Sequence, residues 1–156
     1  MQKQIPPPAL VDFVRDLRSQ GKTLATLNGS FDLLHAGHLQ IIYEASLQSD
    51  LLLVCLNTDT SIRLYKGPKR PLVPLEERLQ MMSALGFVDY VTWFDDPNPI
   101  RLLRLVQPDV HVNGGEYGKN CIEASTVRSS GGRLHIVPII PGLSTTRLLE
   151  KIKQCG

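Results

Sequence analysis

Two patterns of apolar residues alternate along the chain: short runs of strand length, and longer stretches with helical spacing. The mostly apolar runs are residues 23–27, 51–56, 89–94, 109–112 and 134–137. Residues 51–56 are apolar at every position, which is typical of a parallel strand covered on both faces. Because a helical pattern separates each run from the next, we predict an α/β fold: a doubly wound sheet of five parallel strands with helices on both faces.

The helical spacing predicts seven helices, and the last of them starts at an N-cap serine, Ser144. In that helix we expect Leu148, Leu149 and Ile152 to face inward. Successive prolines make residues 1–8 an extended or mobile lead-in. No repeat or second domain is apparent, so residues 1–156 are expected to form one domain. The predicted helices are 9–19, 38–48, 60–65, 75–85, 99–106, 121–129 and the one that follows Ser144.

Composition narrows the functional classes. The formal net charge of +2 over 156 residues is too small to indicate a nucleic-acid partner. Three cysteines without C-x-x-C spacing favour a reduced, cytoplasmic setting over a disulfide framework or a zinc site. We expect no membrane association, because no apolar run approaches about 18 residues and the N-terminus lacks a signal-peptide core.

The segment from residue 28 to residue 38 carries the strongest chemical signal. It leaves a predicted strand, enters a predicted helix and ends in His35-Ala36-Gly37-His38. A helix N-terminus attracts anions through its free N–H groups, and Gly37 allows a ligand to come close. The alternative, a capping histidine beside a surface histidine, does not explain the whole pattern. We therefore predict that the two histidines donate to a phosphate. A zinc site is not predicted, because no third metal ligand lies at a usual spacing.

Three further polar groups follow predicted strands or lie in neighbouring loops. A loop with three prolines carries Lys66, Lys69 and Arg70, and Arg78 follows on the next helix; converging cations of this kind suit a pyrophosphate or triphosphate. The turn 113–116 contains two glycines, which permit backbone contact with a flat ring or ribose. Ser144, Thr145 and Thr146 at a helix N-terminus form a second candidate anion site. Each group also has an alternative without function: the basic loop would be a solvated surface loop, residues 113–116 an ordinary turn, and Ser144 a plain N-cap.

These motifs together resemble the H-x-G-H nucleotidyltransferase superfamily, whose cytidylyltransferase-like members join a nucleoside monophosphate to a phosphorylated acceptor. Within it the chain is most similar to the heptose 1-phosphate adenylyltransferases, which often form one half of bifunctional ADP-heptose synthases. The similarity runs from residue 17 to residue 152 and implies a Rossmann-like sheet. The chain departs from this group at Ser30, where cysteine is common, and at Asn113, where lysine is common.

The resemblance implies transfer of AMP from ATP to a sugar 1-phosphate by direct in-line attack, with pyrophosphate released. Mg²⁺ would come bound to ATP, and a separate sugar kinase would supply the acceptor; homo-oligomer formation is left open. The implied catalytic residues are His35, His38, Lys66 and Arg78. The implied nucleotide-binding residues are Asn28, Gly29, Ser30, Phe31, Asp32, His35, Gly37, His38, Asn113, Gly114, Gly115, Glu116, Ser144, Thr145 and Thr146. The acceptor or its phosphate would contact Asp32, Asn57, Lys66, Arg70 and Arg78.

Two other functions are compatible with the same motifs. The first is a cytidylyltransferase that acts on glycerol 3-phosphate or phosphoethanolamine, because such enzymes share the H-x-G-H and Ser-Thr-Thr elements. The second is a non-catalytic nucleotide-binding module that regulates a partner enzyme, which would bind a nucleotide without turning it over.

Overall fold

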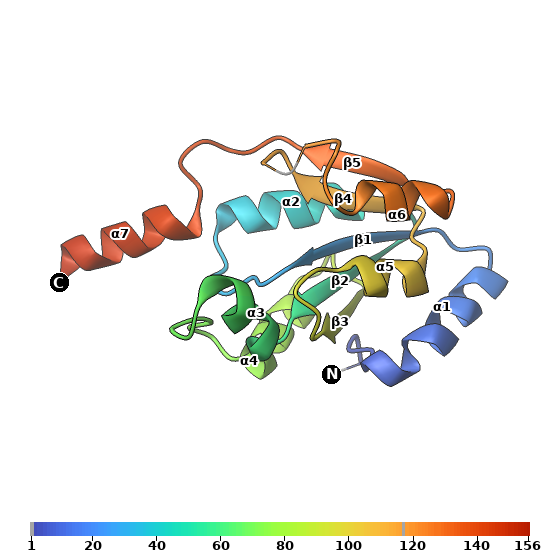
Figure 1. Ribbon diagram of the computed structural model, residues 1–156, viewed down its shortest axis with the longest axis horizontal. Coiled ribbons are helices and arrows are strands. Elements are labelled where there is room, and N and C mark those ends of the chain that lie inside the picture. The colour runs from blue at the N-terminus through green and yellow to red at the C-terminus, as the bar shows by residue number, and fades with distance from the viewer. Residues whose placement is uncertain (1, 117) are drawn as a thin grey trace.

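The computed structural model describes residues 2–116 and 118–156, and a five-stranded parallel sheet forms its centre (Figure 1). The spatial order is β3-β2-β1-β4-β5 and every neighbouring pair is parallel, as predicted. All strands therefore end at the same edge of the sheet, where ligands bind in open α/β folds. The strands are β1 (Leu24–Gly29), β2 (Leu51–Asn57), β3 (Tyr90–Phe94), β4 (Val110–Gly114) and β5 (Arg133–Val137).

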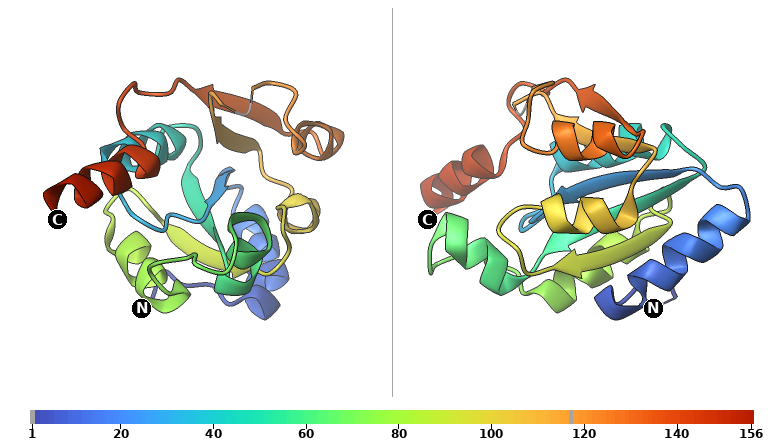
Figure 2. Two further views of the ribbon diagram at one scale, coloured as in Figure 1. Left: turned by 60° about the vertical axis from the view of Figure 1, so that its left-hand side comes forward. Right: turned by 45° about the vertical axis from the view of Figure 1, so that its right-hand side comes forward.

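Helices cover both faces of the sheet (Figure 2). Helices α2 and α4 pack on one face, while α1 and α5 pack on the other, with α6 beside α5. Among the described residues no helix has the length and apolar character needed to cross a bilayer. The helices are η1 (a 3₁₀ turn, Pro7–Ala9), α1 (Leu10–Ser19), α2 (Ala36–Ser46), α3 (Asp59–Lys66), α4 (Leu75–Ala84), α5 (Ile100–Val106), α6 (Ala124–Ser129) and α7 (Thr145–Cys155).

Strand β2 shows why the continuous apolar run was informative. Its side chains alternate between two separate apolar clusters: Leu52, Val54 and Leu56 face α2 and α4, and Leu53 and Cys55 face α1 and α5. All five are fully buried. A strand with one wet face could not carry this pattern, because half of its side chains would be exposed to water.

The described part of the lead-in lies against the sheet. Ile5 N–H donates to the Val91 carbonyl at 2.8 Å, and Val91 N–H donates to the Lys3 carbonyl at 2.9 Å. The Lys3 ammonium also donates to the backbone carbonyls of Leu85 and Val88, at 2.9 and 2.7 Å. These contacts extend the edge of the sheet beyond β3, although prolines interrupt the segment.

The C-terminal helix differs from the prediction. No residue of α7 is buried, and the helix projects from the body of the protein (Figures 1 and 2). Leu148 and Leu149 are only half-buried and Ile152 is 57% exposed, so the expected inward face was wrong. An amphipathic pattern identifies an apolar stripe, but it does not identify what covers that stripe. Helix α6 also begins at Ala124, three residues later than the predicted start at 121.

Candidate functional site

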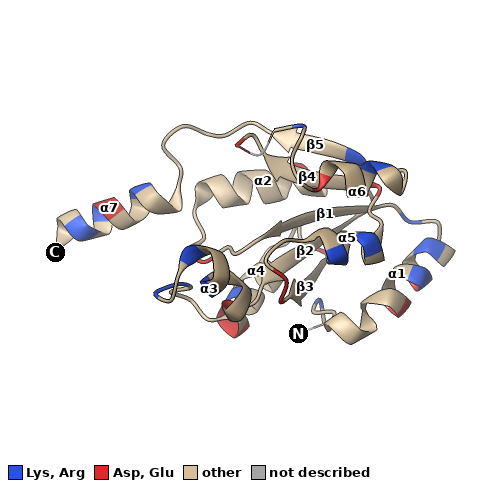
Figure 3. Cartoon of the chain, in the orientation of Figure 1, with Lys and Arg blue, Asp and Glu red and all other residues tan. Residues whose placement is uncertain are grey.

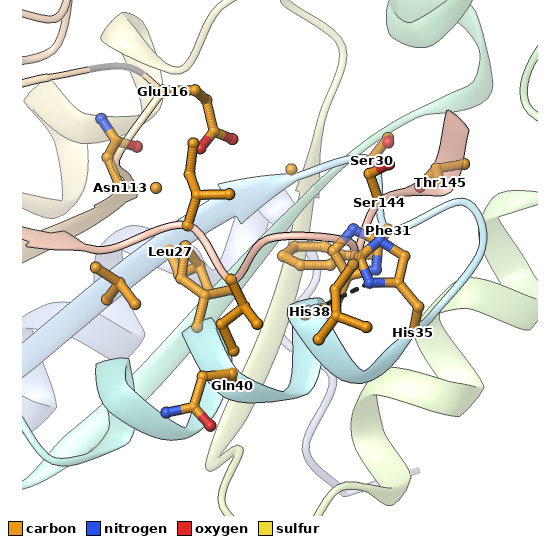
Figure 4. A pocket seen from close by; sticks show the side chains of 18 of the residues that line it. Leu27, Ser30, Phe31, His35, His38, Gln40, Asn113, Glu116, Ser144 and Thr145 are labelled. Atoms are coloured by element: carbon orange, nitrogen blue, oxygen red, sulfur yellow. Dashed lines mark hydrogen bonds between the residues drawn. The ribbon is translucent and has the colours of Figure 1, made fainter. Parts of the chain in front are cut away.

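A pocket of about 420 Å³ lies beyond the carboxyl ends of β1, β4 and β5 (Figure 4). The N-terminal ends of two helices, α2 and α7, also contribute to its lining. The structure thus brings together residues that are more than 100 positions apart in the sequence. The predicted site residues that line the pocket are Asn28, Gly29, Ser30, Phe31, His35, Gly37, His38, Lys66, Asn113, Gly114, Glu116, Ser144 and Thr145.

The two histidines form a stacked pair at the start of α2. Their ring centroids are 3.7 Å apart and the ring planes are inclined by 21°. His35 is the N-cap residue, and its Nδ1 accepts a hydrogen bond from the backbone N–H of His38 at 3.4 Å. A neutral imidazole that accepts at Nδ1 carries its proton at Nε2, so Nε2–H of His35 is free to donate to a ligand.

Burial keeps this pair neutral. Desolvation, with a smaller contribution from the nearby His35, lowers the pKa of His38 to about 4. Desolvation also lowers the pKa of His35. At neutral pH His38 is therefore an uncharged hydrogen-bonding group. Its Nδ1 is buried and has no hydrogen-bond partner among the described residues.

A strained residue and two glycines fix the surroundings of the pair. Phe31 has a positive φ of 47°, is buried, and presents its ring at 70° to that of His38, with the centroids 5.2 Å apart. A Cβ at Gly29 would lie only 3.0 Å from the Phe31 ring. A Cβ at Gly37 would lie 3.0 Å from the His35 ring and 3.1 Å from Cβ of Leu143. Glycine at 37 therefore allows the segment before α7 to approach α2 closely.

Asp32 shapes the basic loop and does not line the pocket. Its carboxylate accepts hydrogen bonds from the backbone N–H groups of Leu72 and Val73 and forms an ion pair with Arg70, 2.6 Å from its Nε. Burial would raise the pKa of Asp32, but these hydrogen bonds and the Arg70 charge outweigh burial and lower it. The Asp32 carboxylate is only 1% exposed. Asp32 and Arg70 were both predicted to contact ligands, but neither lines the pocket.

Arg78 is also held within the protein. Its side chain is fully buried and donates to the carbonyls of Val73, Ser30 and Asn57 and to the Asp59 carboxylate, at 2.7–2.9 Å. A guanidinium enclosed in this way cannot reach a ligand in this conformation. The structure therefore does not bring Arg78 to the pocket, where a catalytic cation was expected. It ties the segment after β1 to the end of β2 and to the basic loop.

Lys66 is the only lysine or arginine among the described residues that line the pocket. It ends α3, and its ammonium donates to the Ser30 hydroxyl at 3.1 Å. Desolvation, and then the nearby charge of Arg70, lower its pKa. Figure 3 shows further cations on the loop between α3 and α4, at the same end of the sheet.

The last two predicted groups reach the pocket in part. Asn113, Gly114 and Glu116 line it, whereas Gly115 does not. Asn113 and Gly114 belong to β4 itself, so the predicted turn begins two residues later. The Ser144 hydroxyl accepts from Arg147 N–H at 3.2 Å as an N-cap, as expected.

Two other predicted site residues lie outside the pocket. Thr145 lines it, but its neighbour Thr146 is exposed on the outside. Asn57 is buried, and its amide nitrogen donates to the Ser61 hydroxyl at 2.9 Å. Its place at the end of β2 therefore serves the start of α3.

Comparison with known proteins agrees with this geometry. Residues 26–148, most of the chain, match the family described as cytidylyltransferase-like. The chain belongs to the cytidylyltransferase-like family. The predicted membership of the H-x-G-H nucleotidyltransferases is thereby confirmed.

Curated relatives of this cytidylyltransferase-like chain include proteins named bifunctional protein HldE. The relative from Syntrophotalea carbinolica is 41% identical over 145 residues, and the one from Geobacter sulfurreducens is 43% identical over 136 residues. These alignments cover 92% and 86% of this chain. They span only 30% and 28% of the relatives, so the chain corresponds to less than a third of those proteins.

Solved structures show the same fold. The lipopolysaccharide core biosynthesis protein from Thermoplasma volcanium is 28% identical with a TM-score of 0.62, covering 77% of this chain and 98% of that one. Pantoate–beta-alanine ligase from Francisella tularensis has a TM-score of 0.58 at 14% identity, covering 92% of this chain and 75% of that one. The second likeness concerns the fold alone.

Several apolar residues that line the pocket were not predicted from the sequence. The pocket is lined by Val137, which is the last residue of β5, by Pro138, Ile139 and Ile140 directly after it, and by Leu143 before α7. Their position was a signal, because they end or follow a predicted strand at the same sheet edge as the other groups. They went unnoticed because apolar residues after a strand carry no chemical signature. No cluster of three or more His, Cys, Asp or Glu suited to a metal occurs within residues 2–116 and 118–156.

Proposed function

We propose that the chain transfers AMP from ATP to a sugar 1-phosphate, D-glycero-β-D-manno-heptose 1-phosphate being the preferred acceptor, and releases pyrophosphate. The observation that carries this proposal is the meeting of two helix N-termini in one pocket, one with stacked neutral histidines and the other with hydroxyls. Each N-terminus presents N–H groups to an anion. Two such ends suit a polyphosphate better than a single phosphate.

The reaction needs little covalent chemistry from the protein. A phosphate monoester attacks the α-phosphorus of ATP directly, so no general base is required, and positioning and charge stabilisation supply the rate. His35 and His38 would donate to the oxygens on which charge develops, and Lys66 would attract the departing pyrophosphate. Glu116 is the only acidic side chain among the described lining residues, so Mg²⁺ would be held mainly by phosphate oxygens.

Two features support the heptose acceptor. The relatives named HldE are bifunctional proteins of which this chain matches less than a third, as expected for one of their two activities. The Thermoplasma volcanium structure is titled a lipopolysaccharide core biosynthesis protein. A separate sugar kinase would then form the sugar 1-phosphate, and the enzyme would work in the cytoplasm, where ATP is available.

Pyrophosphate release tests the proposal. The purified protein is incubated with Mg²⁺ and ATP, CTP, GTP or UTP, each with heptose 1-phosphate, glycerol 3-phosphate or phosphoethanolamine. We expect release only with ATP and heptose 1-phosphate. Release with CTP and one of the other two acceptors would replace the proposal by the cytidylyltransferase alternative. Nucleotide binding without release from any pair would indicate the non-catalytic module.

A further inference from the structure

A buried polar network holds the side-chain amide of Asn113 in one orientation. Asn113 lies at the end of β4 and is 4% exposed, and its amide nitrogen donates to Glu123 Oε2 at 3.5 Å and to Cys121 Sγ at 3.2 Å. Glu123 is itself 5% exposed. Figure 4 shows the amide oxygen of Asn113 on the pocket side, with the nitrogen turned away.

The chemistry of the partners fixes this orientation. A carboxylate only accepts hydrogen bonds, so the NH₂ group of Asn113 must face Glu123. Burial and the adjacent Glu123 raise the pKa of the Cys121 thiol, which therefore stays protonated and can donate to Glu123 while accepting from Asn113. Turning the amide over would place its oxygen against a carboxylate in a buried setting, which is costly.

The amide oxygen of Asn113 is the half of the amide that faces the pocket. No described residue donates to Oδ1 of Asn113, although the side chain lines the pocket. Asn28 lies beside it on β1, because Leu27 pairs with Val112. Oδ1 of Asn28 is buried and has no partner among the described residues. The buried oxygen of Asn28 needs a donor, and the pocket-facing oxygen of Asn113 can accept a hydrogen bond from a ligand.

We propose that Asn113 reads the nucleotide base by accepting a hydrogen bond from an exocyclic amino group, and that Glu123 is the positioning residue that sets this polarity. The inference rests on the proposed function, because it assigns the base to the β4 end of that same pocket. Adenine and cytosine present an amino donor at this edge, whereas hypoxanthine and uracil present a carbonyl oxygen. Two facing oxygens repel, so the site discriminates amino bases from keto bases.

Calorimetric binding of ATP and ITP in the presence of Mg²⁺, without acceptor, tests the inference. The two nucleotides differ at the 6-position of the purine, where ITP carries a keto oxygen. We expect the unmodified protein to bind ATP on the order of 10–100-fold more tightly than ITP, the discrimination expected when a buried acceptor is left facing an acceptor. Equal affinities for ATP and ITP would overturn the proposal.

Variants separate base reading from general support of the fold. Asn113→Leu keeps the size but removes the acceptor, and should weaken ATP binding about 10-fold with little change for ITP. In Glu123→Gln the new side chain can present either its oxygen or its NH₂ group to Asn113, so it no longer fixes the orientation of the Asn113 amide. The ratio of ATP affinity to ITP affinity should therefore fall several-fold. Cys121→Ser replaces the thiol by a hydroxyl that can still donate and accept, so the ratio of the two affinities should stay the same. Proper folding of each variant is checked by its thermal unfolding.

The outcomes are distinct. If Asn113→Leu leaves the ratio of ATP affinity to ITP affinity unchanged, Asn113 does not read the base. If Glu123→Gln weakens the binding of both nucleotides equally, the role of Glu123 is structural. If the protein prefers CTP to ATP, the proposed adenylyl transfer fails, and the CTP-to-UTP ratio in the same variants decides the inference. If no nucleotide binds to the folded protein, both proposals fail.

Discussion

The two helix N-termini that line the pocket are supported in opposite ways. Helix α2 carries the histidine pair, and its Ile42 and Ala45 are completely buried against the sheet. Helix α7 carries Ser144 and Thr145, yet none of its residues is buried. One end of the pocket is thus built into the core, whereas the other rests on an N-cap and a loop.

This difference in support fits two different functions, transition-state stabilisation at α2 and ligand binding at α7. Groups that stabilise a transition state must be held in place beforehand, because reorganisation during the reaction costs rate. Groups that hold the tail of a ligand can instead be ordered by that ligand, at some cost in affinity. The contrast predicts that changes on the α2 side act on stability or turnover, and that changes on the α7 side act on nucleotide binding.

The largest expected effect is on the supported side, at Arg78. Replacing it in Arg78→Met should lower the free energy of unfolding by about 3–5 kcal/mol, because the Asp59 carboxylate and three carbonyls lose a buried partner. Urea unfolding measures the change, and Arg101→Met, an exposed arginine on α5, is the matched control. A loss below about 1 kcal/mol would mean that this buried arginine does not anchor the pocket wall.

The second effect is on turnover. His38→Ala should lower kcat on the order of 10²–10³-fold, by analogy with removal of one transition-state donor, while the protein remains folded. Steady-state pyrophosphate release measures the effect, with His135→Asn as the control because His135 lies on β5 outside the pocket. Near-normal kcat in folded His38→Ala would remove the histidine pair from the proposed mechanism.

The sequence predicted the elements with a local cause. The apolar run 51–56 and the His35–His38 turn depend on nearest neighbours, and both lie where expected. The prediction that the apolar face of α7 is buried was wrong, because nothing in the described structure covers that face. Periodicity reports the face of a helix, and only the tertiary structure reports what lies against it.

Charge was similarly ambiguous before the fold was known. Lys66 and Arg78 carry the same sign and lie near one loop in sequence, yet one lines the pocket and the other is enclosed by carbonyls. A planar guanidinium with five donors is well suited to joining several backbone segments, and sequence alone does not show which use it has. Glu123 escaped notice for a related reason, since its role depends on contact with Asn113 across the β4–α6 connection.

The smallest expected effect compares two hydroxyl N-caps, Thr58 and Ser144. The Thr58 hydroxyl caps α3, which packs on the sheet through buried Ile62, and it accepts from Ser61 N–H at 3.2 Å. The Ser144 hydroxyl caps the unburied α7 at the same distance from Arg147 N–H. Thr58→Ala should therefore lower the free energy of unfolding by about 1 kcal/mol, because the lost cap belongs to the cooperative core. The variant also removes the hydrogen bond that the Thr58 hydroxyl donates to Asp95 Oδ1 at 2.7 Å.

Ser144→Ala should change the same free energy by less than about 0.5 kcal/mol, since fraying of α7 exposes no core. It should instead raise the KM for ATP several-fold, because the loss of a cap disorders an N-terminus that lines the pocket. Urea unfolding and ATP kinetics on both variants provide the comparison. Equal losses of stability in the two variants would show that α7 is held by contacts of its own, and the contrast between the two ends of the pocket would then disappear.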